Sequence, residues 1–397
     1  MHINKPEMQD RASFSADWGN WALFYGSVFF FVANLFAAIA IFPAYSLAIG
    51  STPFQAGLQN TAFGLAAVLL RLFLGPVMDR QGPKPLMLFG LFSFATTPLL
   101  LMLSPSFNML LVARIYQSIG LAVVLPGIST LIAEMAPDGR IGTYLGASKI
   151  FSNLGLLVGP AGALFIIESF GYGGWLIISA LTGLVALALL AGVRTPTVAV
   201  NIEKIASSWN QIKKALAEKQ IYPIIAGVAL FSFSYSAVIS FAAVHIETSA
   251  PGSEAAYFFM ILGLTGIVAS LAAGAITDRF GHQRVAWPML IILGIGAAFF
   301  YYIPIWPTMI VICAIILGIG IQGSSLVFTA WMIDISRPGL RATTISIQEN
   351  TIDLFFAVGA LTFGLAAQGP GLGITFLVTG ILTISFVLPL RRISASL

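Results

Sequence analysis

Long apolar runs, separated by polar or Gly/Pro breaks, recur along the whole of this 397-residue chain. An α-helix needs about 20 mainly apolar residues to cross the ~30 Å hydrocarbon core of a bilayer. Hydrophobic residues make up 58% of the sequence, whereas soluble domains contain roughly 45 to 50%. The runs therefore predict an integral membrane protein.

Twelve such runs are predicted as transmembrane spans. The period-2 alternation of a membrane β-barrel is absent, and backbone in lipid must otherwise satisfy its hydrogen bonds as helix. The predicted fold class is therefore all-α. The spans are 21–49, 55–78, 85–104, 108–133, 143–168, 174–193, 221–245, 255–277, 285–303, 308–333, 342–367 and 372–390.

Basic residues are distributed unevenly among the connections between these spans. Sixteen of the 19 Lys and Arg lie in the N-terminal tail, in every second connection or at the C-terminal end, and the other connections hold none. The positive-inside rule then predicts that both termini and these basic connections are cytoplasmic, with the chain in the cell inner membrane. The net charge of +4 reflects this topology and does not point to nucleic acid.

Two stretches half a chain apart share a pattern. GPVMDRQGPK, from Gly75 to Lys84, and GAITDRFGHQR, from Gly274, both contain Gly-x-x-x-Asp-Arg-x-Gly, and LIAEMAPDGRIGT is repeated at a similar offset as WMIDISRPGLRAT. Parallel repeats with a substrate site near the midplane are a recurring design of secondary transporters. The predicted organisation is an N-terminal tail at 1–20, a six-helix bundle at 21–193, a cytoplasmic linker at 194–220 and a second six-helix bundle at 221–397.

The linker contains apolar residues at helical spacing, which suggests an interfacial helix on the lipid headgroups. A plain flexible linker is the alternative. The apolar positions are Ile202, Ile205, Trp209, Ile212 and Leu216.

The first repeated stretch resembles motif A of the major facilitator superfamily, in its residues and in its place between the second and third spans. The resemblance covers essentially the whole chain and implies two pseudo-symmetric six-helix bundles that work by alternating access. Motif A is thought to hold the outward-open form, so the matching residues are gating candidates. They are Gly75, Asp79, Arg80, Gly82 and Lys84, with Asp278 and Arg279 in the weaker second copy.

Two further motifs narrow the branch of the superfamily. RIYQSIG, with Arg114 and Gln117, resembles motif B of the fourth span, although Ser118 replaces a usual Gly. The fifth span resembles motif C, which is associated with antiporters and implies export. Its glycines are Gly146, Gly155, Gly159 and Gly162, the last one place earlier than usual. The alternative is that these glycines only allow close helix packing.

Ionisable side chains inside spans are costly, so each is a functional candidate. Glu349 and Asp353 are four residues apart, share a helix face, and repel one another in a low dielectric, which favours protonation of one of them. We predict Asp353, near the midplane, as the proton site, with Glu349, Arg114 and Lys149 as further coupling candidates. The alternative is that both acids are permanent ion-pair partners of basic residues in the spans.

Arg71 and Glu349 lie at matching depths, each about 12 Å from the cytoplasmic boundary at 1.5 Å per residue. An ion pair between them across the two halves is predicted, with Gly75 at the closest approach of the second and eleventh spans. The alternative is that Arg71 reaches the headgroups or pairs with Asp79. Two further gating candidates at cytoplasmic helix ends, Glu134 and Asp334, are predicted to pair with loop arginines.

Polar and aromatic residues near mid-span are candidates for contact with an amphipathic organic substrate. Packing or helix-to-helix hydrogen bonding is the alternative role for each. These candidates are Asn34, Tyr116, Gln117, Tyr235, Gln322 and Asn350.

No metal site, cofactor or catalytic set is predicted. His245 and Glu247 have a poor spacing for metal ligands and are interpreted as ordinary surface residues. Lone Cys313 can form no internal disulfide. A nucleotide-binding loop and a Ser/His/Asp arrangement are both missing from the sequence, which disfavours a primary pump or a membrane enzyme.

The sequence therefore predicts a secondary active transporter, acting as a monomer among membrane lipids, that exports a small organic molecule in exchange for protons. A drug, a metabolite and a metallophore-type molecule are the substrate classes considered. An uptake symporter or facilitator is the alternative within transporters. A non-transporting receptor of transporter fold is the alternative from another class.

Overall fold

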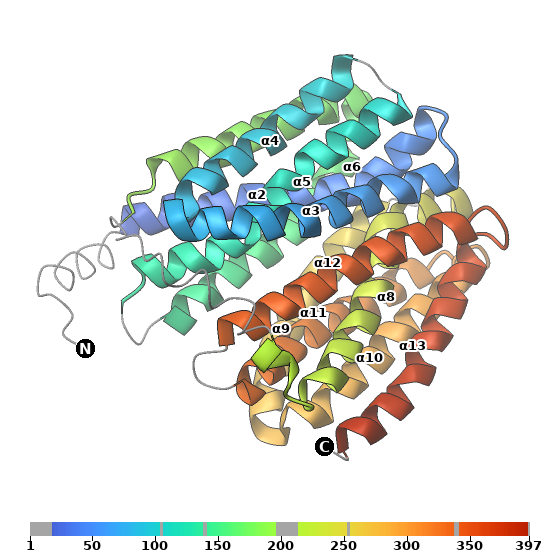
Figure 1. The fold of residues 1–397 in the computed structure, drawn as a ribbon. Coiled ribbons are helices and arrows are strands. Elements are labelled where there is room, and N and C mark those ends of the chain that lie inside the picture. Colours follow the sequence, from blue (N-terminus) through green and yellow to red (C-terminus); the bar gives the residue numbers. More distant parts are fainter. Residues whose placement is uncertain are drawn as a thin grey trace, which may run out of the picture. The chain divides into compact units, whose positions relative to one another are not determined.

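The computed structural model describes residues 18–103, 106–137, 141–195, 213–251, 255–336 and 341–395. In this part of the chain nearly every residue is helical, apart from short turns and one 3₁₀ turn (Figure 1). The predicted all-α membrane fold is confirmed.

The helices follow one another with short connections. They are α2 (Trp18–Ala48), α3 (Pro53–Gln81), α4 (Pro83–Leu103), α5 (Phe107–Met135), α6 (Ile141–Gly192), α8 (Ile221–Ser249), α9 (Ala255–Phe280), α10 (His282–Phe299), the 3₁₀ turn η2 (Phe300–Tyr302), α11 (Met309–Ile335), α12 (Arg341–Ala366) and α13 (Leu372–Ala395).

Helix α6 contains two spans joined at a sharp break. Gly171 has φ 66° and ψ −178° inside it, a backbone conformation that only glycine adopts readily. The break falls between the predicted spans 143–168 and 174–193. Gly371, 200 positions later between α12 and α13, also has a positive φ of 85°, so a glycine of this kind lies between the last two spans of each half.

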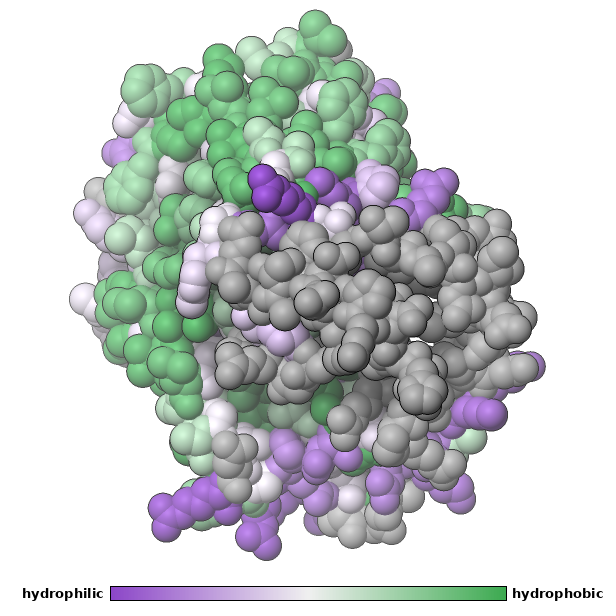
Figure 2. Space-filling model, turned by 90° about the vertical axis from the view of Figure 1, so that its left-hand side faces the viewer, coloured by the Kyte–Doolittle hydropathy of each residue, from purple (hydrophilic) through white to green (hydrophobic). Residues whose placement is uncertain are grey.

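The described helices have the composition of a multi-pass membrane protein. Nine of them are long and apolar enough to cross a bilayer, with α6 counted once. Large apolar side chains such as Phe73 and Leu271 are exposed, and apolar residues cover wide areas of the face drawn in Figure 2. Soluble monomers rarely expose apolar surface on this scale.

Two names describe the helix ends below. The basic ends adjoin connections with Lys and Arg, such as Gln81–Lys84 and Gly281–Arg284. The far ends adjoin the connections in between, such as Ile49–Thr52 and Ala367–Gly371.

The chain groups into two compact units, each described by itself. The first unit comes from residues 1–205, but the far-end parts of α2 and α3 and a short piece of α6 belong to the second. The bundle boundary at 194–220 stays a prediction, and residues 196–212, with most of the predicted interfacial helix, lie outside the described residues. The first unit comprises Met1–Phe36, Ala66–Gly159 and Ile166–Ile205, and the second comprises Ala37–Leu65, Pro160–Phe165 and Ala206–Leu397.

Helices within each unit pack through small residues. In the first unit α4 lies against α5, where a Cβ built on Gly90 would come within 3.0 Å of Gly120 Cα. In the second unit α10 lies against α11, where a Cβ built on Gly320 would lie 2.6 Å from Leu293 N. Backbones approach this closely only where side chains are small. Helix α8 also packs against α12, and α10 against α13.

Candidate functional site

The two copies of motif A form the same turn at the basic ends. Gly82, between α3 and α4, has φ 79°, and Gly281, between α9 and α10, has φ 83°. Both positions therefore favour glycine for its backbone freedom. The side chains of Asp79, Arg80 and Asp278 lie outside the described residues, so their gating roles stay predictions. The guanidinium of Arg279 lies 5.4 Å from the centre of the Phe280 ring.

The last residue of motif A holds two helices together. Lys84 Nζ donates to Ala191 O at 3.1 Å and to Val193 O at 2.6 Å, at the end of α6. A cation on the last carbonyls of a helix satisfies them and complements the helix dipole. At the corresponding place in the second half, Gln283 Nε2 donates to Ser394 Oγ at 2.9 Å. Lys84 thus has a structural role within its own half.

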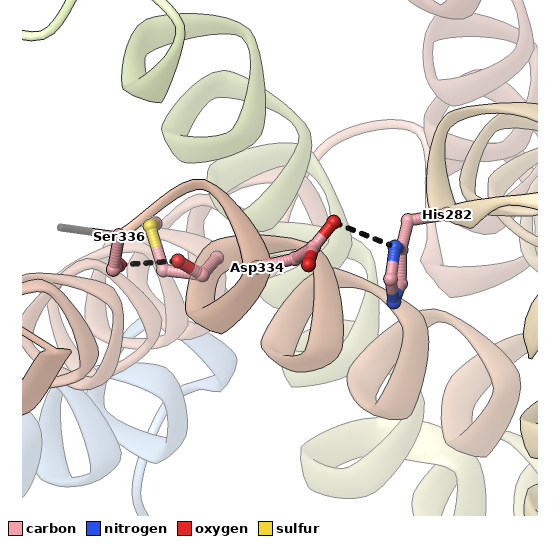
Figure 3. A network of polar contacts seen from close by, with 4 residues as sticks. His282, Asp334 and Ser336 are labelled. Atoms are coloured by element: carbon pink, nitrogen blue, oxygen red, sulfur yellow. Dashed lines mark hydrogen bonds and ion pairs between the residues drawn. The ribbon is translucent and has the colours of Figure 1, made fainter. Parts of the chain in front are cut away.

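Asp334 contacts a histidine at the basic end of the second half. The His282 Nδ1 atom, at the start of α10, lies 3.6 Å from Asp334 Oδ2 (Figure 3). Asp334 is predicted to pair with a loop arginine, and Arg337 of that loop lies outside the described residues. His282 makes this contact an ion pair only when it is protonated. Glu134 lies half-buried near the corresponding end of α5.

The motif B residues form a buried polar pair. Arg114 and Gln117 are both 0% exposed, and Arg114 Nη1 donates to Gln117 Oε1. They are three residues apart in α5, which places them on one face. A guanidinium buried at membrane depth is by default a functional group. Tyr116, between these two residues in the sequence, contacts another helix instead: its hydroxyl lies 3.0 Å from Thr96 Oγ1 on α4.

Asn34 joins α2 to the second part of α6. Its Nδ2 donates to Ser179 O at 2.7 Å, and its Oδ1 accepts from Ser179 Oγ at 2.8 Å. The corresponding contact in the second half joins Ser234 Oγ to Thr383 Oγ1 at 2.7 Å. The amide predicted as a substrate contact is therefore used in helix packing.

Two glycines of motif C lie against α2. A Cβ built on Gly155 would lie 2.9 Å from Ala33 N, and one built on Gly159 would lie 2.1 Å from Ala33 O. A Cβ on Gly146 or Gly162 would meet nothing within 4 Å. Close packing is thus the visible role of the two central glycines.

The second half repeats this contact. Gly359, 200 positions after Gly159, lies on Phe233, 200 positions after Ala33: a Cβ built on Gly359 would be 2.8 Å from Phe233 O. The packing of α6 on α2 therefore has the same register as that of α12 on α8.

Helix α12 carries both carboxylates predicted for proton coupling. Glu349, Asn350 and Asp353 are half-buried. Lys149 and Asn153, 200 positions before Glu349 and Asp353, lie on α6, where Lys149 is exposed. The predicted ion pair between Arg71 and Glu349 joins the two units and stays a prediction.

Two serines of α8 bind the helix turn that contains Asp353. Ser232 Oγ donates to Ile352 O at 2.6 Å, and Ser236 Oγ donates to Phe356 O at 2.7 Å. Hydroxyl groups commonly bridge helices in this way within membranes. These bonds fix the position of the turn on α8.

Aromatic rings lie beside the same turn. The half-buried Tyr235 ring stacks on Phe231 at 5.5 Å between centroids and meets Phe356 edge-on at 5.9 Å. An aromatic surface next to a carboxylate can bind an organic molecule through both ring contacts and charge. Of the predicted substrate contacts, Tyr235 and Asn350 are those that the structure places on α8 and α12, near Asp353.

The far-end part of α3 packs closely on α12. Gly57, Thr61 and Gly64 share one face of α3, and Thr61 Oγ1 donates to Ala357 O at 2.9 Å. A Cβ built on Gly57 would lie 2.3 Å from Ala360 O. The predicted closest approach of the two helices at Gly75 joins the first unit to the second and stays a prediction.

Asn60 is a polar contact that the sequence reasoning missed. Its fully buried amide donates to Ile39 O and to Ser240 Oγ, both at 3.1 Å, and so joins α3 to α2 and α8. The polar run of Gln59, Asn60 and Thr61 in an apolar helix was the available signal.

Two other predicted residues have packing roles. Gln322 on α11 covers Gly266 of α9, where a built Cβ would lie 2.6 Å from Gln322 Cγ. His245 is 3% exposed, so its interpretation as a surface residue is wrong. Its Nε2 lies 3.0 Å from Phe300 O and its Nδ1 lies 3.1 Å from Ser249 Oγ, which makes it a buried histidine with both ring nitrogens in contact.

Comparison with known families identifies the fold. The Major Facilitator Superfamily profile matches residues 24–360, and again 247–395. The chain belongs to this superfamily, which confirms the resemblance seen in its motifs. Its members are transporters, so the protein is a membrane transporter and not an enzyme.

Individual relatives are more distant. The quinolone resistance protein NorA of Staphylococcus aureus (strain Mu50 / ATCC 700699) is 26% identical over 144 residues, which are 36% of this chain and 37% of NorA. The match thus spans little more than a third of that relative.

Solved structures share the fold at low identity. A POT family transporter in complex with 5-aminolevulinic acid has a TM-score of 0.80 at 14% identity, over 98% of this chain and 99% of that one. The nucleoside transporter NupG has a TM-score of 0.73 at 14% identity, over 95% of this chain and 98% of that one.

Proposed function

We propose that the protein is a secondary active transporter that exports a small organic molecule in exchange for protons. The observation that carries this proposal is the turn of α12 around Asp353. Asp353 lies there in a predicted span, in a turn whose backbone carbonyls at Ile352 and Phe356 accept hydrogen bonds from Ser232 and Ser236, and the Phe356 ring of this turn meets Tyr235. An acid in such a place is suited to reversible protonation.

Export is supported by two further observations. The fifth span resembles motif C of antiporters, and NorA, a quinolone resistance protein, is similar to part of the chain. The positive-inside rule supports an orientation in which the basic ends and both termini face the cytoplasm of a cell inner membrane.

Tyr235, Phe356 and Asn350 are proposed as substrate contacts beside Asp353, and Arg114 with Gln117 as a second polar site. Asp353 binds the proton, and Glu349 and Lys149 tune the coupling. Motif A and the basic helix ends, including Arg71, Glu134 and Asp334, act in gating. This arrangement suits an organic molecule with an aromatic part and a polar group.

Transport into proteoliposomes tests the direction. Purified protein is reconstituted, a fluorescent quinolone is supplied outside, and a pH gradient is imposed in either direction. Antiport predicts accumulation only when the interior is acidic, so that protons leave as the probe enters. Accumulation only with an acidic exterior would show a symporter, and flux indifferent to pH would show a facilitator.

A broader ligand screen tests the alternative that the protein is a non-transporting receptor of transporter fold. Thermal stabilisation of the purified protein by a panel of small organic molecules identifies ligands, and each ligand is then tested for flux. The proposal expects at least one ligand that is also transported. Ligands that bind without any flux would favour a receptor of transporter fold.

A further inference from the structure

The connection between α10 and α11 presents an aromatic surface at the far end of the second unit. Its side chains Tyr301, Tyr302, Ile305 and Trp306 are all exposed, the last two by more than half. The rings of Tyr302 and Trp306 stack at 6.0 Å between centroids, and Tyr301 meets Tyr302 edge-on at 5.4 Å. These four residues are called the aromatic tip below.

The aromatic tip stands on a buried base. Phe300 and Ile303 are both 0% exposed, and the Phe300 ring stacks on Phe376 of α13 at 4.5 Å between centroids. The turn is closed by a backbone hydrogen bond in which Trp306 N donates to Tyr302 O at 2.9 Å. The exposed rings are therefore carried by a folded turn that is packed against the rest of the unit.

The hairpin that carries the tip contains no charged side chain. From Val285 to Ile333 the sequence has no Asp, Glu, Lys, Arg or His. Tyr and Trp are enriched at membrane–water interfaces, where their rings lie against lipid and their O–H and N–H groups meet polar headgroups. The chemistry of the tip therefore fits the surface of a bilayer.

The length of α10 gives the tip a matching depth. Tyr302 follows His282, at the start of α10, by 20 residues. At 1.5 Å per residue this distance is about 30 Å, the thickness of the hydrocarbon core. When the start of α10 lies at one boundary of the core, the tip thus lies at the other. The next exposed apolar side chains, Val311 and Ile312 of α11, belong to the surface that the bilayer covers.

The equivalent connection of the first half is made differently. Met102 and Ser106 stand 200 positions before Tyr302 and Trp306. Ser106 Oγ accepts a hydrogen bond from Met109 N at 3.3 Å and caps the start of α5. A connection at this place therefore forms without exposed rings, so the rings of the aromatic tip are additional to what the turn requires.

We propose that the aromatic tip binds the phospholipid headgroup layer at the far ends of the helices and holds the second unit at a fixed depth in the bilayer. Trp306 is the main anchor: its indole N–H donates to lipid oxygens while its ring and Ile305 lie against the upper acyl chains. Because α10 packs on both α11 and α13, the anchor acts on all three helices. The inference is independent of the exported molecule and of the proton site.

Spin labels test the depth of the tip in the full-length protein. Single cysteines are introduced as Ile305→Cys in the tip, Ile312→Cys on α11 and Gln368→Cys in the exposed connection between α12 and α13. Each protein also carries Cys313→Ala, is labelled with a nitroxide, and is placed in nanodiscs of phosphatidylcholine and phosphatidylglycerol. Collisions of the label with oxygen report lipid, and collisions with a water-soluble nickel chelate report solvent.

The label at Ile305 should collide with the nickel chelate several times less often than the label at Gln368, and with oxygen several times more often. Ile312, about 9 Å along α11 from Trp306, should be shielded from nickel more strongly still. This comparison needs no variant of Trp306, so it tests the proposal whether or not such variants fold.

Substitutions of Trp306 test the anchor itself. Trp306→Ser should raise the nickel accessibility at Ile305 severalfold, because the amphipathic ring is lost. Trp306→Tyr keeps such a ring and should stay close to the parent protein. Trp18→Ser is the matched control, since Trp18 is an exposed tryptophan at the basic end of α2, and it should leave the label at Ile305 unchanged.

Each other result overturns the inference. Nickel accessibility at Ile305 equal to that at Gln368 would place the tip in water, where a protein partner and not lipid would bind it. A label at Ile305 shielded from both nickel and oxygen would show that another copy of the protein covers the tip. A lipid-exposed label that Trp306→Ser does not affect would show that Trp306 is not the anchor.

Discussion

Two helix pairs that occupy equivalent places in the sequence repeat are held together by different sets of contacts. In the first half, α2 and the first part of α6 pack through Gly155, Gly159 and aromatic rings, with Tyr25 stacked on Phe151 at 5.1 Å and Trp21 against Tyr144 at 4.2 Å between centroids. The first pair has one hydroxyl-to-carbonyl bond, from Tyr25 Oη to Tyr144 O at 3.0 Å. In the second half, α8 and α12 are joined by two such bonds, both from serines, and by the contact of Tyr235 with Phe356.

The two pairs share one feature: a glycine of one helix packs against a backbone carbonyl of the other. Gly159 and Gly359 rest on residues that are themselves 200 positions apart. The differing feature is charge: Asp353 and Glu349 correspond to Asn153 and Lys149. The comparison teaches that the repeat has kept its packing register while the ionisable chemistry has diverged, so an acid appears in one half only at these positions.

The largest expected effect comes from breaking the shared feature. Gly159→Ala places a Cβ 2.1 Å from Ala33 O, so α6 must move away from α2. We expect a loss of about 3 kcal/mol, the upper range for overpacking, seen as a lower melting temperature in detergent. Gly359→Ala should cost less, because its nearest atom is 2.8 Å away.

Gly162→Ala is the control for this series, since a Cβ there meets nothing within 4 Å. It should melt like the parent. Equal melting temperatures for the Gly159 and Gly162 variants would show that the close packing of α2 on α6 does not matter for stability.

A smaller effect is expected from removing the two serine bonds of the second half. The double variant Ser232→Ala and Ser236→Ala loses two interhelical bonds, each worth roughly 0.6 kcal/mol in a membrane. Thermal unfolding should show a loss of about 1 kcal/mol. The control is Ser270→Ala, because the Ser270 hydroxyl donates to Gly266 O within its own helix. If the double variant melts like the parent protein, the serine bonds do not stabilise the packing of α8 on α12.

The smallest effect concerns the basic ends. Lys84→Met removes a cation from the last carbonyls of α6 and should cost about 0.5 to 1 kcal/mol, less at high salt because the site is partly exposed. Gln283→Leu removes the neutral equivalent and should cost about 0.5 kcal/mol, independent of salt. An identical salt dependence in both variants would argue against the helix-dipole role of Lys84.

Much of the fold was predictable because a bilayer leaves few choices. Apolar runs of the required length must be helices, and the predicted spans correspond to the helices from α2 to α13, including the break in α6 at Gly171. The positive φ of Gly82 and Gly281 agrees with the repeated turn of motif A.

The roles of neutral polar residues were less predictable. Asn34 and Ser234 make the same kind of interhelical bond, yet only Asn34 was singled out, and as a substrate contact. Thr61 and Asn60 were missed because their importance depends on which helix lies opposite, and that depends on long-range packing. His245 was assigned to the surface because a sequence gives no measure of burial for a polar residue near a helix end.

The central claim is that Asp353 carries the coupled proton in the second half. Proteoliposomes with the Asp353→Asn protein test it through the accumulation of a fluorescent quinolone driven by an acidic interior, compared with exchange of the same probe at equal pH on both sides. The amide imitates the protonated acid, so we predict that exchange continues while gradient-driven accumulation is lost, with Glu349→Gln affected less. An Asp353→Asn protein that still accumulates the probe under the pH gradient, at the level of the unchanged protein, would contradict the claim.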